Sequence, residues 1–136
     1  MRIAIFSDTF LPQINGISSV VYQNACMLAE RNHKVSVFTA ARENRNSIKA
    51  TKPEKFDIVT IPSMPMPAYP GERLAMPTGM TILKAKKFAP EIIHVHTPFS
   101  VGWEAVWSAR FLKVPLVGTH HTFFNHYLKH IKMDFV

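Results

Sequence analysis

Four of the seven histidines of this chain stand at the ends of two short apolar runs. His94 and His96 close the first run, and His120 and His121 close the second. A histidine side chain serves as a general acid or base, as a hydrogen-bond donor or acceptor, and as a metal ligand. We therefore expect the chemistry of this protein where the two runs end.

A metal site is the first alternative. His94 and His96 form a His-x-His pair, and His126 and His130 are one helical turn apart, a spacing found in zinc sites. Residues i and i+2 of a strand point to opposite faces, however, so the first pair converges only where its strand ends. Asp, Glu and Cys are also scarce nearby. We keep a metal-dependent hydrolase as an alternative and expect no metal.

The elements around these histidines form a strand–helix–strand unit. The run from 92 is followed by a helical segment at 102–112 and by a second strand at 114–119. Parallel strands joined in this way end at the same edge of a sheet. We interpret His94 as a buried, hydrogen-bonded histidine, and the three histidines past the strand ends as the better candidates for a site.

Strands and helices alternate along the remaining chain, which predicts an α/β fold with a doubly wound, mostly parallel sheet. The common strand order 3-2-1-4-5 places the first strand beside the fourth, and ligands bind at that switch point. The loop 8–16 and the turn 94–98 would then form opposite walls of one crevice. The other expected strands are 2–7, 34–39 and 56–61, and the other expected helices are 17–31 and 78–88.

Three segments have other compositions. Residues 40–55 are polar and basic, which indicates an exposed connection. Residues 62–77 carry five prolines, which predicts an extended surface loop. Residues 123–136 have apolar side chains at helical spacing, which predicts an amphipathic helix.

The length of 136 residues and the 47% hydrophobic content suit a single domain. The single cysteine, Cys26, excludes an intrachain disulfide, and we expect neither a cleaved signal peptide nor a membrane span. The net charge of +7 fits an ordinary basic surface, a phosphate-bearing ligand or an anionic membrane. Gly16 lies just before a helix, where backbone N–H groups can meet a phosphate. A non-catalytic domain that binds a phosphorylated ligand is therefore a further alternative.

Three segments together resemble the amino-terminal domain of the family 4 glycosyltransferases of GT-B fold. They are Phe-Ser-Asp-Thr-Phe-Leu-Pro-Gln-Ile-Asn-Gly (6–16), Pro-Glu-Ile-Ile-His-Val-His-Thr-Pro (90–98) and Val-Gly-Thr-His-His-Thr (117–122), in the family's order and at similar spacing. The resemblance covers essentially the whole chain. The opening segment is most similar to members that glycosylate diacylglycerol or phosphatidylinositol lipids, or that make sulfoquinovosyl lipids.

The resemblance implies one half of a two-domain enzyme built from Rossmann-like domains. Such enzymes move a sugar from a nucleotide-sugar donor to an acceptor with retention of configuration, usually without a metal, and the nucleotide-sugar is a substrate, so no cofactor is implied. The family's second domain, which holds the donor nucleotide and a Glu-x7-Glu motif, is absent from residues 1–136. We therefore expect a single domain truncated at its carboxyl end and inactive alone, since leaving-group stabilisation is missing.

The resemblance also implies roles for individual residues. His121 matches the family histidine that faces the transferred sugar, and we predict it to be catalytic. The predicted donor-binding residues are Asn15, Gly16 and Thr119, and the predicted acceptor-binding residues are Asp8, His96 and Thr97.

The partners implied are a nucleotide-sugar donor, a lipid or glycan acceptor such as a membrane glycerolipid, and the missing donor domain, but no nucleic acid. The expected location is cytoplasmic, peripheral at the inner face of the membrane. Basic and apolar side chains provide a membrane-facing surface in this interpretation: Lys84, Lys86, Lys87, Lys129, Lys132, Met64, Met66 and Tyr69.

Overall fold

The computed structural model describes residues 1–11, 15–41, 55–68, 71–97 and 99–121. Its main feature is a five-stranded parallel sheet in the order β3-β2-β1-β6-β7. The strands β1, β2, β3, β6 and β7 correspond, in this order, to the five strands predicted from the sequence. The predicted order 3-2-1-4-5 is therefore confirmed. The strands are β1 (Arg2–Ser7), β2 (Lys34–Ala40), β3 (Asp57–Ile61), β6 (Ile92–Val95) and β7 (Leu116–Gly118).

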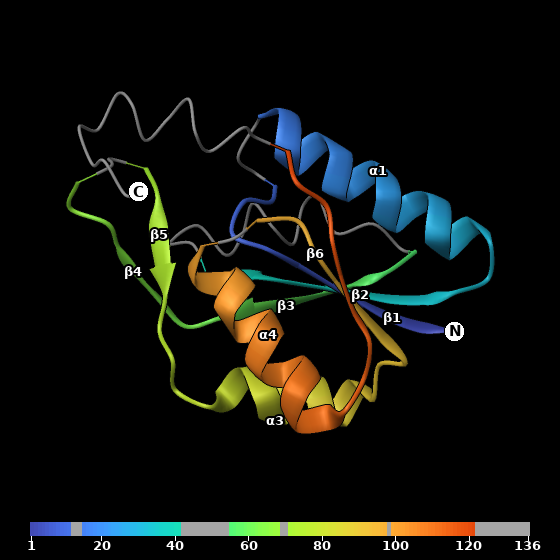
Figure 1. Cartoon of the computed structure of the whole chain (residues 1–136). Coiled ribbons are helices and arrows are strands. Elements are labelled where there is room, and N and C mark those ends of the chain that lie inside the picture. The colour runs from blue at the N-terminus through green and yellow to red at the C-terminus, as the bar shows by residue number, and fades with distance from the viewer. Residues whose placement is uncertain (12–14, 42–54, 69–70, 98, 122–136) are drawn as a thin grey trace, which may run out of the picture.

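Helices cover both faces of this sheet (Figure 1). One face carries α1 (Gly16–Glu30), and the other carries α3 (Met80–Phe88) and α4 (Ser100–Leu112). The three helices predicted within the described residues are confirmed, with starts shifted by one or two residues. Each ends where a residue adopts a left-handed backbone, at Asn32, Ala89 and Lys113, with φ of 65°, 55° and 55°.

The alternation of side chains along β1 builds two separate cores. Ile3 and Ile5 face α1, whereas Ala4 and Phe6 face α3 and α4, because successive strand residues point to opposite faces. Phe6 stacks on Phe38 of β2, with ring centroids 4.6 Å apart and planes at 2°. A sheet buried on both faces accounts for the continuous apolar runs of its central strands.

The prediction of an extended loop at 62–77 is wrong in part. β4 (Ser63–Pro65) and β5 (Arg73–Ala75) pair as an antiparallel hairpin beside the main sheet (Figure 1). A two-stranded ribbon tolerates Pro65, because a proline at a free edge removes no ladder hydrogen bond. Arg73 stabilises the hairpin by donating from Nε to the Ser63 hydroxyl at 2.8 Å and from Nη2 to the Ser63 carbonyl at 2.9 Å.

Other sequence predictions lie outside the described residues. These are the amphipathic helix at 123–136, most of the connection at 40–55, and the pair His126 and His130.

Candidate functional site

The loops that follow β1, β6 and β7 lie at one edge of the sheet, the carboxyl edge of its parallel strands. β1 and β6 are neighbours with Phe6 opposite Val95, so the chain reverses its winding direction between them. The carboxyl edge at such a switch point is where open α/β sheets bind ligands. All seven residues predicted for the site belong to these loops or to the strand and helix ends beside them.

Asp8 joins the end of β1 to the start of α4. Its carboxylate accepts hydrogen bonds from the Thr97 hydroxyl at 2.6 Å, the Ser100 hydroxyl at 2.7 Å and the Val101 backbone N–H at 2.9 Å. The Asp8 backbone N–H in turn donates to Thr97 Oγ1 at 2.8 Å. The residue that precedes α4, Phe99, offers no side-chain cap, so Asp8 supplies this helix start with a carboxylate from a distant strand.

This network gives Asp8 and Thr97 a structural role that sequence reasoning missed. Both side chains are buried, with exposed fractions of 5% and 3%. Their proposed contact with an acceptor remains a prediction, and it would be made from beneath the surface of the crevice. The signal in the sequence was a carboxylate directly after a buried strand, together with hydroxyl residues at the next helix start.

Gly102 is a second residue that sequence reasoning missed. A Cβ added there would lie 2.2 Å from the carbonyl oxygen of Thr97, far inside van der Waals contact. Only glycine therefore lets the first turn of α4 approach the turn after β6. This close approach brings the Val101 N–H to Asp8.

Asn15 and Gly16 form the start of α1. The Asn15 side chain accepts from the Ser18 N–H at 2.8 Å, and the Ser18 hydroxyl lies 3.2 Å from the Asn15 N–H, which makes a reciprocal cap. No atom of the described residues lies within 4 Å of a Cβ built on Gly16, and the φ angle of Gly16 is not positive. The described part of the fold therefore does not require a glycine at this position.

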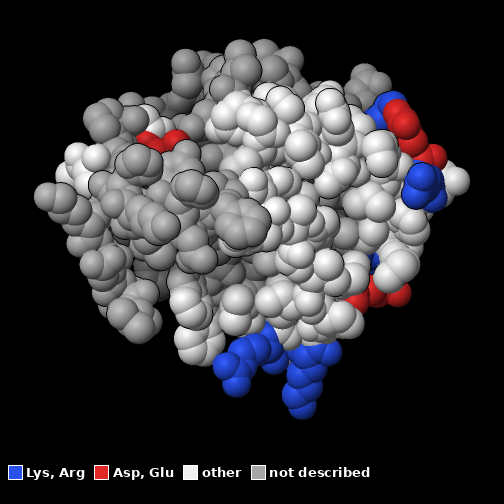
Figure 2. Space-filling model, turned by 45° about the horizontal axis from the view of Figure 1, so that its top comes forward, with Lys and Arg blue, Asp and Glu red and all other residues white. Residues whose placement is uncertain are grey.

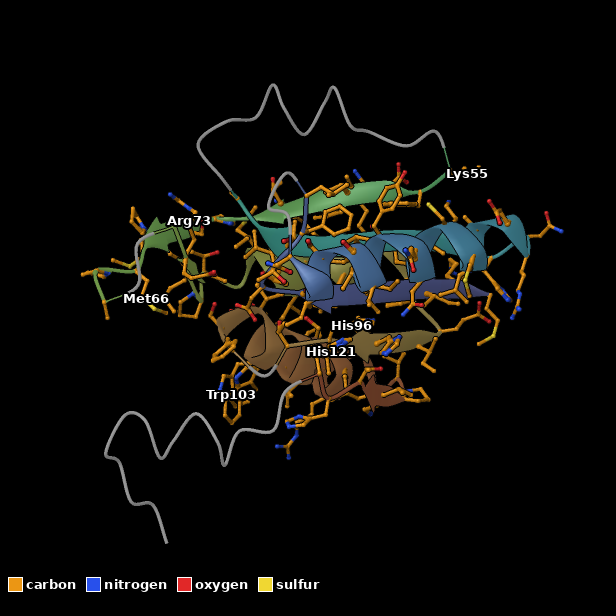
Figure 3. The ribbon with its side chains drawn as sticks, turned by 90° about the horizontal axis from the view of Figure 1, so that it is seen from above. Lys55, Met66, Arg73, His96, Trp103 and His121 are labelled. Atoms are coloured by element: carbon orange, nitrogen blue, oxygen red, sulfur yellow. The ribbon has the colours of Figure 1, made fainter. Side chains whose placement is uncertain are left out.

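His96 and His121 lie side by side (Figure 3). His96 Nδ1 is 2.9 Å from His121 Nε2, and the rings are stacked with centroids 5.1 Å apart. His96 is only 1% exposed, whereas His121 is partly exposed. The histidine expected to face an acceptor is thus a buried neighbour of the histidine expected to face the sugar.

His94 was predicted to be buried, and it is less buried than expected. It is hydrogen-bonded as expected, from Nε2 to the Thr119 hydroxyl at 2.6 Å, but it is only partly buried. The packed member of the pair is His96, because β6 ends at Val95 and the chain then turns inward. At this strand end the two rings converge, with centroids 4.1 Å apart.

The surroundings favour neutral imidazoles. Burial, with His94 and His121 adding to it, lowers the pKa of His96 to about 4. Burial and then His121 lower the pKa of His94 as well. Both rings are therefore uncharged at neutral pH, and they act as hydrogen-bonding groups rather than as cations.

An open hollow of about 240 Å³ lies at the same edge. It is lined by Val95, Thr97, Gly118, Thr119 and His120, which belong to the ends of β6 and β7. The hollow thus contains one residue predicted for the donor, Thr119, and one predicted for the acceptor, Thr97. Within the described part of the chain, no group of three or more His, Cys, Asp or Glu side chains is arranged to hold a metal.

Comparisons with known proteins identify what this arrangement is similar to. The family model of Glycosyltransferase Family 4 matches residues 14–135. The alpha-monoglucosyldiacylglycerol synthase of Streptococcus pneumoniae is 34% identical over 132 residues, which is 96% of this chain and 29% of that protein. The GDP-mannose-dependent alpha-mannosyltransferase of Corynebacterium glutamicum is 28% identical over 90% of this chain and 29% of its own length.

A solved structure gives the same fold. Acinetobacter baumannii MurG superposes with a TM-score of 0.62 at 15% identity, covering 96% of this chain and 39% of that one. The chain therefore spans less than a third of the two curated relatives and a minority of this structural neighbour.

Proposed function

Because the chain belongs to glycosyltransferase family 4, we propose that it forms the acceptor-binding half of a retaining GT-B enzyme. The enzyme would move a sugar from a nucleotide-sugar to a lipid acceptor, with a second domain closing the crevice. One observation carries this proposal: the loops after β1, β6 and β7 meet at the switch point of the sheet, where His121 and the hollow lie. Relatives named for a glucolipid and for GDP-mannose support the substrate classes.

In this proposal the two walls of the crevice have different tasks. The start of α1 at Gly16 receives the donor diphosphate, since helix N-termini bind anions through free N–H groups. Asn15 fixes that helix start, Thr119 lies in the hollow, and His121 meets the transferred sugar. Asp8, Thr97 and His96 hold the acceptor wall in shape. The sugar and acceptor are polarised and oriented by this chain, and the leaving nucleotide is held by the second domain.

Turnover by the gene product that carries this chain tests the proposal. The assay supplies a nucleoside-diphosphate glucose or GDP-mannose as donor, with diacylglycerol or a monoglycosyl diacylglycerol in vesicles as acceptor. We expect His121→Ala to lower kcat/KM by about 10²-fold or more, the contribution of a group acting on the reacting centre. Its far-ultraviolet circular dichroism should match that of the wild type.

His33→Ala is the matched control, because His33 contacts the amino-terminal amine at 3.2 Å, away from the carboxyl edge. It should retain full turnover. Wild-type turnover in His121→Ala removes this residue from the site. Binding of the donor without turnover by the wild type supports the non-catalytic alternative. Stoichiometric Zn or Mn, with activity lost on chelation, supports the hydrolase.

We also propose that the outer surface of α3 and α4 seats the enzyme on the cytoplasmic face of a membrane. No described helix is long and apolar enough to cross a bilayer. Figure 3 shows Trp103 pointing from α4 away from the sheet. We define the α3–α4 face as the following exposed side chains: Met80, Leu83, Trp103, Trp107 and Phe111, with exposed fractions of 45%, 60%, 63%, 58% and 62%.

The charge around the α3–α4 face is basic. Its exposed ionisable side chains are Lys86, Lys87, Arg110 and Lys113, whereas the one acidic residue of the two helices, Glu104, is 7% exposed. On the side where Figure 1 places these helices, Lys and Arg side chains project from the surface in Figure 2. Aromatic rings with flanking cations suit the interface of an anionic bilayer. This face replaces the surface expected from the sequence in part, since Lys84 turns back to the Thr60 carbonyl at 2.8 Å.

The two tryptophans of the chain both lie on this face, so intrinsic fluorescence reports its contact. Vesicles containing phosphatidylglycerol should shift the emission to the blue, and vesicles of phosphatidylcholine alone should shift it less. Trp107→Ser should weaken sedimentation with the anionic vesicles by about tenfold. Met27→Ser, which removes a 49% exposed side chain from α1 on the opposite face, should leave it unchanged. Equal loss in both variants would exclude the α3–α4 face as the docking surface.

A further inference from the structure

The contact between His96 and His121 constrains which ring nitrogen carries a proton. His96 Nδ1 and His121 Nε2 are 2.9 Å apart, so one of them must be protonated and the other bare. With His96 neutral at pH 7 and His121 in its neutral form, two arrangements are possible. In the first, His96 donates from Nδ1 to Nε2 of His121; in the second, His121 donates from Nε2.

The buried side of His96 distinguishes the two arrangements. Its Nε2 is buried and has no hydrogen-bond partner among the described residues. If His121 donated, the proton of His96 would have to sit on this Nε2 as a buried N–H without an acceptor. If His96 donates, Nε2 is a bare lone pair. An orphaned buried N–H is rarer in proteins than an under-satisfied acceptor, so the first arrangement is favoured.

Neighbouring groups hold the His96 ring in place for this contact. The His94 ring packs against it at 4.1 Å, and His94 is itself fixed by its 2.6 Å bond to the Thr119 hydroxyl. On the other side, Thr97 is tied to Asp8. Among the described residues, the titratable groups that face the ring are His94 and His121.

We infer that His96 is a positioning residue that fixes His121 as the tautomer protonated at Nδ1. The other ring nitrogen of His121, Nδ1, is then a donor, and the ligand atom that it meets must be a hydrogen-bond acceptor, such as a sugar hydroxyl oxygen. This second part rests on the proposed function, whereas the tautomer itself does not.

Long-range proton–nitrogen correlation spectra of the chain labelled with ¹⁵N-histidine test the tautomer directly. At pH 7 we expect both His96 and His121 to show a protonated Nδ1 and a bare Nε2. His96→Asn keeps an amide N–H near the position of Nδ1 and should preserve the pattern of His121. His96→Phe fills the space without a donor and should move the proton of His121 to Nε2, the form that free histidine prefers in water.

His33→Phe serves as the control and should leave the signals of His121 unchanged. A wild-type spectrum with the proton of His121 on Nε2 overturns the inference, whether or not the His96→Phe variant folds. The result needs neither ligand nor turnover, so it stays separate from the proposed function. If transfer is unaffected by His121→Ala while the Nδ1 tautomer is seen, the proposed role of His121 in transfer fails and the tautomer stands.

Donor analogues test the ligand side in the active gene product. Replacing the sugar hydroxyl that meets His121 by fluorine keeps an acceptor, and replacing it by hydrogen removes it. Across a series that changes one hydroxyl at a time, one position should lose about tenfold more donor affinity as the deoxy than as the fluoro analogue, and His121→Ala should abolish that difference. Equal losses at every position would show that His121 does not donate to the sugar.

Discussion

Among the described residues nothing lies near a Cβ built on Gly16, and its backbone is ordinary, so this part of the fold gives no reason for a glycine. Alanine is the better helix former and reduces the entropy of the unfolded chain. We therefore predict that Gly16→Ala raises the free energy of unfolding by about 0.5–1 kcal/mol, measured by urea denaturation.

The same substitution should impair the enzyme, because a methyl group at the helix start keeps a diphosphate from the backbone N–H groups. Loss of hydrogen bonds to a charged ligand predicts a fall in donor affinity of about tenfold or more, measured by titration with the nucleotide-sugar. Gly16→Ala should therefore stabilise the fold and weaken donor binding. A variant that is more stable and binds the donor as the wild type does would contradict a role for Gly16 in donor binding.

Gly102 is the opposite case, because a contact inside the molecule requires a glycine at this position. A Cβ there would overlap the Thr97 carbonyl at 2.2 Å, and a backbone atom cannot move aside as a flexible side chain can. We predict that Gly102→Ala lowers the free energy of unfolding by about 3 kcal/mol, as for overpacked cores. Gly118→Ala is the matched control, because its Cβ would meet only Val95 Cγ1 at an ordinary 3.7 Å. Equal stabilities of the two variants in chemical denaturation would refute the steric argument.

At the level of the elements, α1 and α4 begin in different ways. α1 is capped locally by Asn15, whereas α4 is capped by Asp8, which is 93 residues from Val101 in the sequence. The second cap therefore fixes a helix and two strands against each other at the switch point. It converts a local capping interaction into a tertiary one.

Substituting each cap should separate these two roles. Asn15→Ala removes a local cap and should cost about 1 kcal/mol of stability. Asp8→Ala leaves the Val101 N–H and two hydroxyl groups without their buried acceptor and should cost about 3 kcal/mol. Hydrogen exchange of the Val101 amide should speed up in Asp8→Ala and stay unchanged in Asn15→Ala. Similar losses and similar exchange rates in both variants would mean that Asp8 acts only as a local polar residue.

Some helices and strands of this fold were predictable from local sequence patterns, and others were not. Apolar runs such as Arg2–Ser7 and the helical spacing of Ser100–Leu112 are local signals, and strand order follows from the alternation of strands and helices. The hairpin at Ser63–Ala75 was missed, because prolines break pairing in a central strand but not at a free edge.

The site was predictable as a place but not as a set of contacts. Residues past the ends of the switch-point strands were identifiable from the sequence alone. The contact of His96 with His121 and the bonds of Asp8 join residues 25 and 89 to 93 positions apart. The bonds of Asp8 depend on how closely α4 approaches the turn after β6, which only a glycine at position 102 permits and which no local pattern encodes.

At the scale of the whole molecule, the sheet lies between the two surfaces proposed for substrate binding and for membrane contact. Its carboxyl edge presents the neutral histidines and the hollow, while the outer surface of α3 and α4 presents aromatic and basic side chains. The core that supports both surfaces contains His96, whose burial links stability to pH.

The folded state holds the pKa of His96 at about 4, against an ordinary value of 6.5. Between these pH values the unfolded chain binds a proton that the folded chain does not. Stability therefore is unaffected by this group above pH 6.5, falls as the pH drops through the window from 6.5 to about 4, and changes no further below it. The full loss is on the order of 3 kcal/mol, and His94, with its lowered pKa, adds in the same direction.

Urea unfolding of the wild type and of His96→Phe at pH 7.5, 5.5 and 4.5 isolates this contribution. The phenylalanine fills the buried volume and cannot titrate, so its stability should decline less steeply over the acidic range, by up to about 3 kcal/mol. Carboxylates that titrate in the same range act equally in both proteins and cancel in the difference. Parallel stability curves for the wild type and His96→Phe would show that His96 is already free to take up a proton in the folded protein.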